Sequence, residues 1–258
     1  MIRYVITVFV IALALGASTS LHASPPTGAV VQTWHYDPNT NMVTAQIVNT
    51  SHKDITAFNI AIKETYANGR VQEHELLEEL VGKIVAAKEL QGTAEGESFH
   101  KQFGDGAFHP GEVWDEKLPV QPGLANYQAV IDVVTYIDGT ADSANDAALE
   151  RIVDGRKVAI ASQEMANEII KTALADPNDP DPCMTAARKI QAQAAARRTH
   201  TKMEVNPVLL ENVANELKTV AAHSTNKRDA LKQLADREDA RISIMTIHAA
   251  LTKNGGPQ

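Results

Sequence analysis

The chain has 258 residues, of which 44% are hydrophobic and 22% are charged, and its formal net charge is −8. This composition is ordinary for a globular protein and leaves room for one large domain or two small ones. The acidic balance argues against a nucleic-acid partner, and the single cysteine, Cys183, excludes an intrachain disulfide. The lone thiol can be buried, free or paired with another chain.

The first element is expected to be a secretory signal peptide over residues 1–23. Arg3 supplies a short positive region, residues 5–15 form an apolar run, and mostly small residues follow. The apolar run is short for a membrane span, which needs about 20 residues. We therefore predict cleavage after Ala23, with Ser20 as the alternative, and a periplasmic or secreted protein with no later transmembrane segment.

The mature chain divides into two halves of different composition. All of its aromatic residues lie between Trp34 and Tyr136. Residues 24–140 carry 7 Lys and Arg against 16 Asp and Glu, whereas residues 141–258 carry 16 of each class. These coincident shifts predict a β-sheet domain over residues 24–140, an α-helical region over 141–252 and a disordered tail over 253–258.

The first half has the alternation of strands. Residues 31–36 alternate before a turn at "DPNTN", and the next run places Val43, Ala45 and Ile47 on one face. Residues 54–66 have an apolar face that carries Phe58, Ile60 and Ile62, and an Asn-Gly pair, typical of a tight hairpin turn, follows. The β-branched run 127–137 predicts a central strand, and the whole favours an antiparallel β-sandwich.

Specific residues in this half carry a resemblance to a known family. They are Asn49, Ser51, Lys53, Ile55, Phe58 and Pro110 to Glu112. In this pattern the chain resembles the immunoglobulin-like accessory β-sandwiches of exported bacterial proteins, including FxLYD-type domains. The Leu-Tyr-Asp signature of that family is replaced by Lys63-Glu64-Thr65-Tyr66. The resemblance implies an immunoglobulin-like fold and a binding or scaffolding role, and it implies no catalytic residue.

The second half has the spacing of amphipathic helices. Apolar residues recur at helical intervals over residues 145–175, and "ADPNDPDPC" ends this helix. An Ala-rich helix is expected over residues 184–202, another begins at Asn206-Pro207, and the last covers residues 227–251. The fold class is therefore α+β, with an N-terminal immunoglobulin-like antiparallel β-sandwich followed by an Ala-rich α-helical segment.

Two histidine-containing segments have the composition of a metal site. "HELLEEL" at His74 lacks a zinc-binding second histidine, because the position four residues later is Glu78. We interpret it as a solvated acidic segment. "HKQFGDGAFHPGE" combines His100, Asp105 and His109 with Glu112, side chains that can bind a divalent metal. Its spacing matches no known site geometry, and a mobile loop between strands is the favoured interpretation.

Three features of the second half carry side chains that could take part in chemistry. "DPNDPDP" at 176–182 offers carboxylates but lacks the glycine and glutamate of an EF-hand loop, so we expect a stiff linker. Cys183 lies at a helix start, where a thiol pKa can fall, yet no base is identifiable. The stretch 183–202 contains five basic residues and no acidic one: Arg188, Lys189, Arg197, Arg198 and Lys202. This helix is solvated, docks on the acidic first half, or contacts an acidic protein or anionic surface.

The sequence lacks Gly-x-Ser-x-Gly, Ser-x-x-Lys and phosphate-binding glycine loops. It therefore predicts an exported, non-catalytic binding or scaffolding protein of the bacterial cell envelope that uses no cofactor. The alternative hypothesis is a metal-dependent envelope hydrolase that uses His100, Asp105 and His109.

Overall fold

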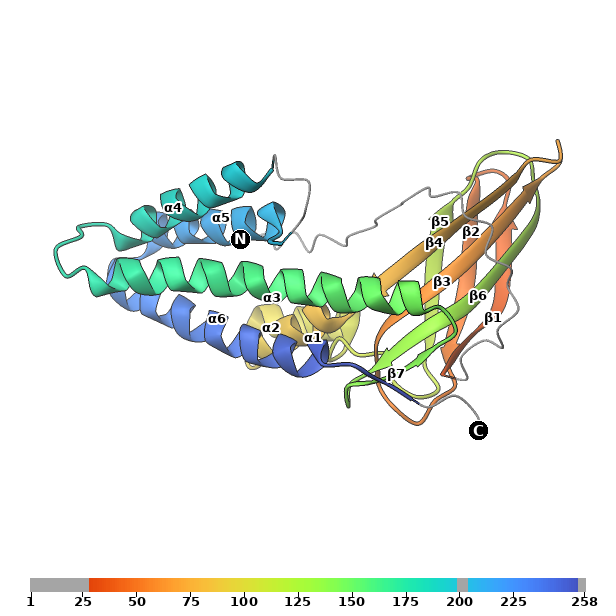
Figure 1. Ribbon diagram of the computed structural model, residues 1–258, viewed down its shortest axis with the longest axis horizontal. Helices are drawn as coiled ribbons and strands as arrows, with labels where there is room; N and C mark the ends of the chain where they lie inside the picture. The colour runs from red at the N-terminus through yellow and green to blue at the C-terminus, as the bar shows by residue number, and fades with distance from the viewer. Residues whose placement is uncertain (1–27, 199–203, 255–258) are drawn as a thin grey trace. The chain divides into compact units, whose positions relative to one another are not determined.

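The computed structural model describes residues 28–198 and 204–254, so the expected signal peptide and Lys202 lie outside the described residues. Eight strands and six helices in this part of the chain confirm the α+β class (Figure 1). The chain divides into two compact units. The first unit combines the residues up to Ile152 with those from Leu251 onward, and the second unit comprises residues 153–250. The boundary falls inside the longest helix, α3 (Asp146–Ala175).

A three-stranded antiparallel sheet opens the first unit. Its strands, in the order β1-β2-β5, are β1 (Ala29–Asp37), β2 (Met42–Asn49) and β5 (Val113–Pro119). The expected turn joins β1 to β2, with Asn41 at φ 53° and its side chain accepting a hydrogen bond from Tyr36 Oη at 3.0 Å. Asparagine tolerates this left-handed conformation better than most residues do.

A five-stranded sheet forms the second layer of this unit. Its strands, in the order β4-β3-β6-β7-β8, are β4 (Val71–Glu79), β3 (Ile55–Tyr66), β6 (Leu124–Tyr136), β7 (Thr140–Ser143) and β8 (Thr252–Lys253). The predicted Asn-Gly hairpin joins β3 to β4, where Gly69 has φ 81° and Tyr66 N donates to Arg70 O at 2.9 Å. β6 lies between β3 and β7, which confirms the prediction of a central strand.

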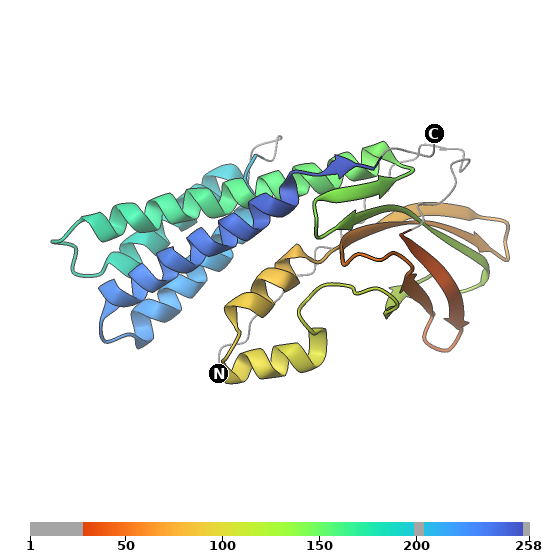
Figure 2. The ribbon, with the colours of Figure 1, turned by 90° about the horizontal axis from the view of Figure 1, so that it is seen from below.

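One apolar core lies between the two sheets, which Figure 2 shows as separate layers. Val43 and Ile47 of β2 and the predicted apolar face of β3 all contribute to it. Phe58 is fully buried, and its ring centroid lies 6.0 Å from those of Phe108 and Trp114. The alternation of both strands and the burial of Phe58 are thereby confirmed.

Two helices interrupt the strands of the first unit, so the expectation of a purely β segment over residues 24–140 is wrong. They are α1 (Val81–Glu89) and α2 (Ala94–Phe103). The Thr93 side chain caps α2 by accepting from Gly96 N at 2.9 Å. Val81 and Ile84 of α1 and Phe99 of α2 are buried. So few buried apolar residues do not give the long helical periodicity by which a helix is recognised in sequence.

The outer face of the five-stranded sheet packs against the first turns of α3. Ala148 and Ile152 of α3 form a small core with Ala57 and Val133. Beside it, Asp132 is an extra residue in β6, because Asn59 pairs with Val133 while Ile60 pairs with Ile131. This bulge turns the Asp132 carboxylate toward the outer face.

Two amides, the buried Asn59 and the partly buried Asn145, hold this carboxylate. Asp132 accepts hydrogen bonds from Asn59 Nδ2 and from Asn145 Nδ2, both at 2.8 Å. Asn145 also caps α3, because its Oδ1 accepts from Ala148 N at 3.1 Å. Burial raises the pKa of Asp132 and the two amides oppose this rise. The polar network fixes where α3 begins on the sheet.

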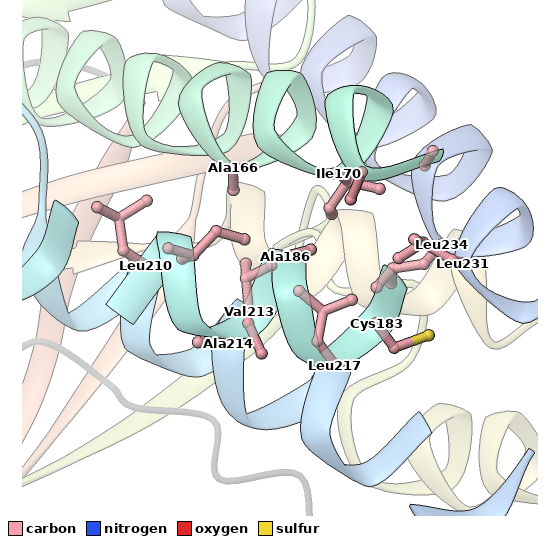
Figure 3. Packing of buried hydrophobic residues seen from close by; sticks show 14 of the residues in the cluster. Ala166, Ile170, Cys183, Ala186, Leu210, Val213, Ala214, Leu217, Leu231 and Leu234 are labelled. Carbon is pink, nitrogen blue, oxygen red and sulfur yellow. The ribbon is translucent and has the colours of Figure 1, made fainter. Parts of the chain in front are cut away.

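The second unit is a helical bundle. It contains the rest of α3 together with α4 (Pro182–Arg197), α5 (Pro207–His223) and α6 (Lys227–Ala249). Asp181, Asn206 and Asn226 cap the last three helices. The predicted helix start at Asn206-Pro207 is confirmed. Small side chains let α4 approach its neighbours closely, and Figure 3 shows Ala186 beside Val213 and Leu217. No helix in the described ranges is both long and apolar enough to cross a membrane.

Two predicted boundaries need correction. The helical region does not begin at residue 141, because Thr140–Ser143 forms β7 of the sheet. A disordered tail from residue 253 is wrong for Lys253 and Asn254. Thr252–Lys253 pairs in parallel with β7, and Asn254 Nδ2 donates to Asp142 Oδ1 at 2.8 Å. Strand pairing between residues so far apart in sequence leaves no local signal.

Replacing Phe58 by Ala should destabilise the first unit by about 3–5 kcal/mol, because it opens a cavity beside the rings of Phe108 and Trp114. Both tryptophans belong to the first unit, so their fluorescence follows its unfolding alone. Urea titrations of the full chain provide the measurement. Val71, which is 50% exposed on β4, is the control site, and Val71→Ala should change stability by less than about 0.5 kcal/mol. Equal effects of the two substitutions would contradict this core.

Candidate functional site

The residues that carry the family resemblance meet around the Asn49 side chain. Asn49 is 1% exposed, and its Nδ2 donates to Phe108 O at 2.7 Å and to Lys53 O at 2.9 Å. Its Oδ1 accepts from Ser51 N at 3.0 Å and from Ser51 Oγ at 2.7 Å. The Asn-x-Ser sequence therefore serves an internal hydrogen-bond network, since all functions of the amide are used.

The backbone completes this network. Asn49 N donates to Glu112 O at 3.2 Å, and Gly111 N donates to Asn49 O at 2.8 Å. Ile55 and Phe108 exchange backbone hydrogen bonds of 3.0 and 3.2 Å. We call the set Asn49, Ser51, Lys53, Phe108 and residues 110–112 the Asn49 network. It joins the end of β2 and the start of β3 to the segment that leads into β5.

His109 lies beside this network between two carboxylates. Its Nδ1 is 2.8 Å from Asp54 Oδ1, and its Nε2 is 2.9 Å from Asp105 Oδ1. The His109 backbone N–H donates to Glu112 Oε2 at 2.7 Å. The hydrogen bond with Asp54 raises the pKa of His109, desolvation opposes this, and the charge of Asp105 adds to the rise. The arrangement favours the imidazolium form, which donates from both nitrogens.

The residues proposed for a hydrolase are only partly brought together. The structure joins Asp105 to His109, but His100 is an exposed residue of α2. The prediction of a mobile loop over this whole segment is wrong, because α2 contains its first part. In the described ranges, no group of three or more His, Cys, Asp or Glu side chains is arranged to hold a metal ion.

"HELLEEL" forms part of β4, so its interpretation as a solvated acidic segment is wrong. Leu76 and Glu78 point inward and are 6% exposed. Glu78 is tolerated there because Lys83 Nζ of α1 lies 2.8 Å from its Oε1. The same ammonium group lies 4.3 Å from the ring centroid of Trp114. A buried carboxylate and an aromatic face thus hold a buried ammonium group.

A second carboxylate, Glu116, lies near this ion pair. Trp114 Nε1 donates to Glu116 Oε2 at 3.0 Å. Burial is the main cause of the raised pKa of Glu116; the charge of Glu78 adds to it, and that of Lys83 opposes it. The inner faces of the sheets therefore contain more carboxylates than Lys83 alone neutralises. The sequence could not show this, because these groups come from β4, α1 and β5.

The remaining candidates of the second half have structural partners. Cys183 is buried and free, and its Sγ lies 3.2 Å from Lys227 O. Burial and then the charge of Asp181 raise the pKa of this thiol, contrary to an activated nucleophile. Within the 176–182 linker, Asp181 caps α4 and pairs with Lys227.

The basic helix is partly compensated inside its own unit. Arg198 makes a bidentate contact with Glu211 of α5, with distances of 2.6 and 2.7 Å from its Nη2. Arg188 and Lys189 are exposed. The Ala-rich face is buried against the bundle, so α4 does not need an acidic partner in order to pack.

Comparisons with known proteins identify no family. No family model matches the chain, and no curated protein matches it. One similar solved structure is that of a hypothetical protein from Peptoclostridium difficile 630, with 13% sequence identity and a TM-score of 0.28. The match covers 48% of this chain and 88% of the other. A likeness at this level supports no conclusion about fold or function.

Asn49→Ala should destabilise the first unit by about 1–3 kcal/mol, because it leaves the buried Phe108 carbonyl without its side-chain donor. Asn126→Ala, at an exposed position of β6, is the matched control and should have little effect. Urea unfolding followed by tryptophan fluorescence measures both. A loss for Asn49→Ala no larger than that of the control would show that the network contributes nothing.

The stability of the first unit should contain a contribution from His109 that depends on pH. Its folded pKa lies above the ordinary value of 6.5. The contribution is therefore fully present below about pH 6.5 and is lost as the pH rises through the folded pKa. His109→Gln should remove this part of the decline between pH 6 and 8.5 in urea midpoints. His52→Gln, in an exposed loop position, should leave the decline unchanged; identical profiles for both variants would refute the assignment.

Proposed function

We propose that the chain is an exported, non-catalytic binding or scaffolding protein of the bacterial cell envelope, whose strand half is an immunoglobulin-like sandwich. The signal-peptide pattern of residues 1–23 supports export. Two layers that share one core, antiparallel except for the short parallel pair of β7 with β8, support the sandwich. The Asn49 network supports the family resemblance, since backbone hydrogen bonds join Asn49 to Gly111 and Glu112, which are motif residues about 60 positions away in the chain.

The observation that carries the binding role is the free outer edge of β1. Within the described ranges, β1 pairs with β2 alone, so its other side offers unpaired backbone groups. The strand also exposes apolar side chains, with Val30 at 39% and Trp34 at 42%. An extended segment can add to such an edge through backbone hydrogen bonds while aromatic side chains give selectivity. Residues 24–140 are acidic, which favours a basic partner.

A second contact is proposed for α4. Its exposed Arg188 and Lys189 are suited to an acidic protein or an anionic surface. Exposed pairs contribute only about 0–1 kcal/mol each and are screened by salt. This contact is therefore weak and reversible.

The competing hypothesis is the metal-dependent hydrolase. The contact of Asp105 with His109 favours it, because a carboxylate often orients a metal-binding imidazole. A metal would need a lone pair on one imidazole nitrogen, and both nitrogens face carboxylates. The geometry supports a structural ion pair better than a metal ligand.

Two measurements test the proposal. The mature N-terminus should lie near Ser24, and the protein should occur in the soluble periplasmic or secreted fraction; intact Met1 in a membrane fraction would refute export.

The purified mature protein should not hydrolyse ester, phosphoester or peptide substrates with added Zn²⁺, Mn²⁺ or Mg²⁺. Metal-dependent turnover that His109→Ala abolishes and His52→Ala preserves would replace the binding role with the hydrolase.

A further inference from the structure

A polar layer crosses the interior of the first unit next to the exposed Trp34. In the three-stranded sheet, Trp34 pairs with Ala45 and Ala45 pairs with Glu116. In the facing sheet, Glu64 pairs with Tyr127. The two rows meet, because the ring centroids of Trp34 and Tyr127 are 5.4 Å apart. We call Trp34, Ala45, Glu64, Glu116 and Tyr127 the inner polar layer.

Glu64 is a buried carboxylate with little compensation. It is 3% exposed and accepts a hydrogen bond from Tyr66 Oη. His74 Nε2 lies 3.7 Å from its Oε1, beyond hydrogen-bond distance. Arg70 lies over the Tyr66 ring, 4.2 Å from the centroid, and donates to Gln121. No lysine or arginine within the described ranges is paired with Glu64.

The Tyr127 hydroxyl is an unpartnered polar group in the same layer. Tyr127 is 2% exposed, and its Oη has no hydrogen-bond partner. Burial raises the pKa of Tyr127, and the charges of Glu64 and Glu116 raise it further, so the hydroxyl lies within the field of both carboxylates. A buried hydroxyl without a partner is costly and calls for a missing donor or acceptor.

A second site in the first unit shows how a buried carboxylate and an aromatic ring can together hold an ammonium group. Lys83 places its ammonium group between the Glu78 carboxylate and the Trp114 ring, at 2.8 and 4.3 Å. The inner polar layer also contains a buried carboxylate, Glu64, and an aromatic ring, Trp34, and no lysine or arginine in the described ranges is paired with Glu64. Glu116 links the two sites, because it accepts a hydrogen bond of 3.0 Å from Trp114 Nε1, whose ring faces Lys83, and pairs across the sheet with Ala45, the partner of Trp34.

We propose that the inner polar layer binds a primary alkylammonium group, with the two carboxylates and the Tyr127 oxygen as acceptors. A primary ammonium is compact and has three N–H donors, one for each of these acceptors. Its alkyl stem would leave along Trp34, whose exposed ring lies at the free edge of β1. A quaternary ammonium has no donors for these acceptors.

This inference rests on the proposed binding role and names its ligand chemistry. The ammonium group comes from a free diamine or from a lysine side chain in an extended segment on β1. Binding is tested on the full mature chain by calorimetry, supported by tryptophan fluorescence. The probes are 1,4-diaminobutane and an acetylated, amidated Val-Lys-Val-Lys-Val peptide. Tetramethylammonium and NaCl at equal ionic strength are the reference cations.

We expect saturable binding of at least one primary-amine probe and none of the reference cations. Glu64→Gln should weaken binding by about tenfold, because it removes one charge-assisted hydrogen bond. Glu73→Gln removes the same charge from an exposed position of β4, paired with Lys63, and should change affinity by less than about twofold. Stronger binding of the peptide identifies a lysine-bearing segment, and stronger binding of the diamine identifies a free amine.

Tyr127→Phe separates binding from folding. It removes a hydroxyl that has no partner in the unliganded protein, so stability should be unchanged or increased while amine affinity falls. Absence of saturable binding by both amines, equal binding by tetramethylammonium, or undiminished affinity in Glu64→Gln would overturn the inference. None of these outcomes bears on export or on the absence of hydrolysis, so the proposed function and this inference can fail separately.

Discussion

The Asn49 side chain is the constraint on which the arrangement of the first unit depends. The chain leaves β2 of one sheet at Asn49 and enters β3 of the other at Ile55, so the turn between them sets how the two layers meet. One amide holds both this turn and the segment before β5 through carbonyls of Lys53 and Phe108. Phe108 is thereby fixed beside Phe58, at the centre of the core. A polar residue thus determines the apolar packing.

The interior of the same unit departs from a purely apolar core. Glu64, Glu78 and Lys83 are all at least nine-tenths buried, and burying a charge is unfavourable unless it is paired. Glu78 and Lys83 meet this condition through each other, and the aromatic face of Trp114 adds to it. Glu64 meets this condition only partly, because it accepts a hydrogen bond from Tyr66 Oη but is paired with no lysine or arginine in the described ranges. Replacing a buried ion pair by apolar residues is often neutral or stabilising, so these charges are not explained by the stability of the fold alone.

Local patterns predicted the elements that local forces determine. The alternation of residues 43–47 and 58–62, the Asn68-Gly69 turn, and the helix start at Asn206-Pro207 are all visible within a few positions. β4 was missed because Glu73, Glu75 and Glu79 hide its apolar positions, and because the cation that permits Glu78 inside comes from the next helix. The contact of His109 with Asp54 joins residues 55 positions apart, and the bulge at Asp132 shifts a register, so neither has a sequence signature.

The cores of the two units are built from different kinds of side chain. The second unit has no aromatic residue, and its core relies on Ala186, Ala187 and Ala194, which allow close helix approach, with capped ends on three helices. Charged side chains of this unit pair at the surface, as Arg198 does with Glu211, and in the interior, where Glu238 of α6 is fully buried and pairs with Arg241. The first unit also keeps carboxylates inside, and it exposes an aromatic ring on an outer strand. The unpaired backbone and the exposed Trp34 belong to the same edge strand, β1, and the ring of Trp34 lies 5.4 Å from that of Tyr127, which pairs with Glu64 on the inner strand β3. Each of these features alone is unfavourable for stability, and the partner that we propose would relieve them together.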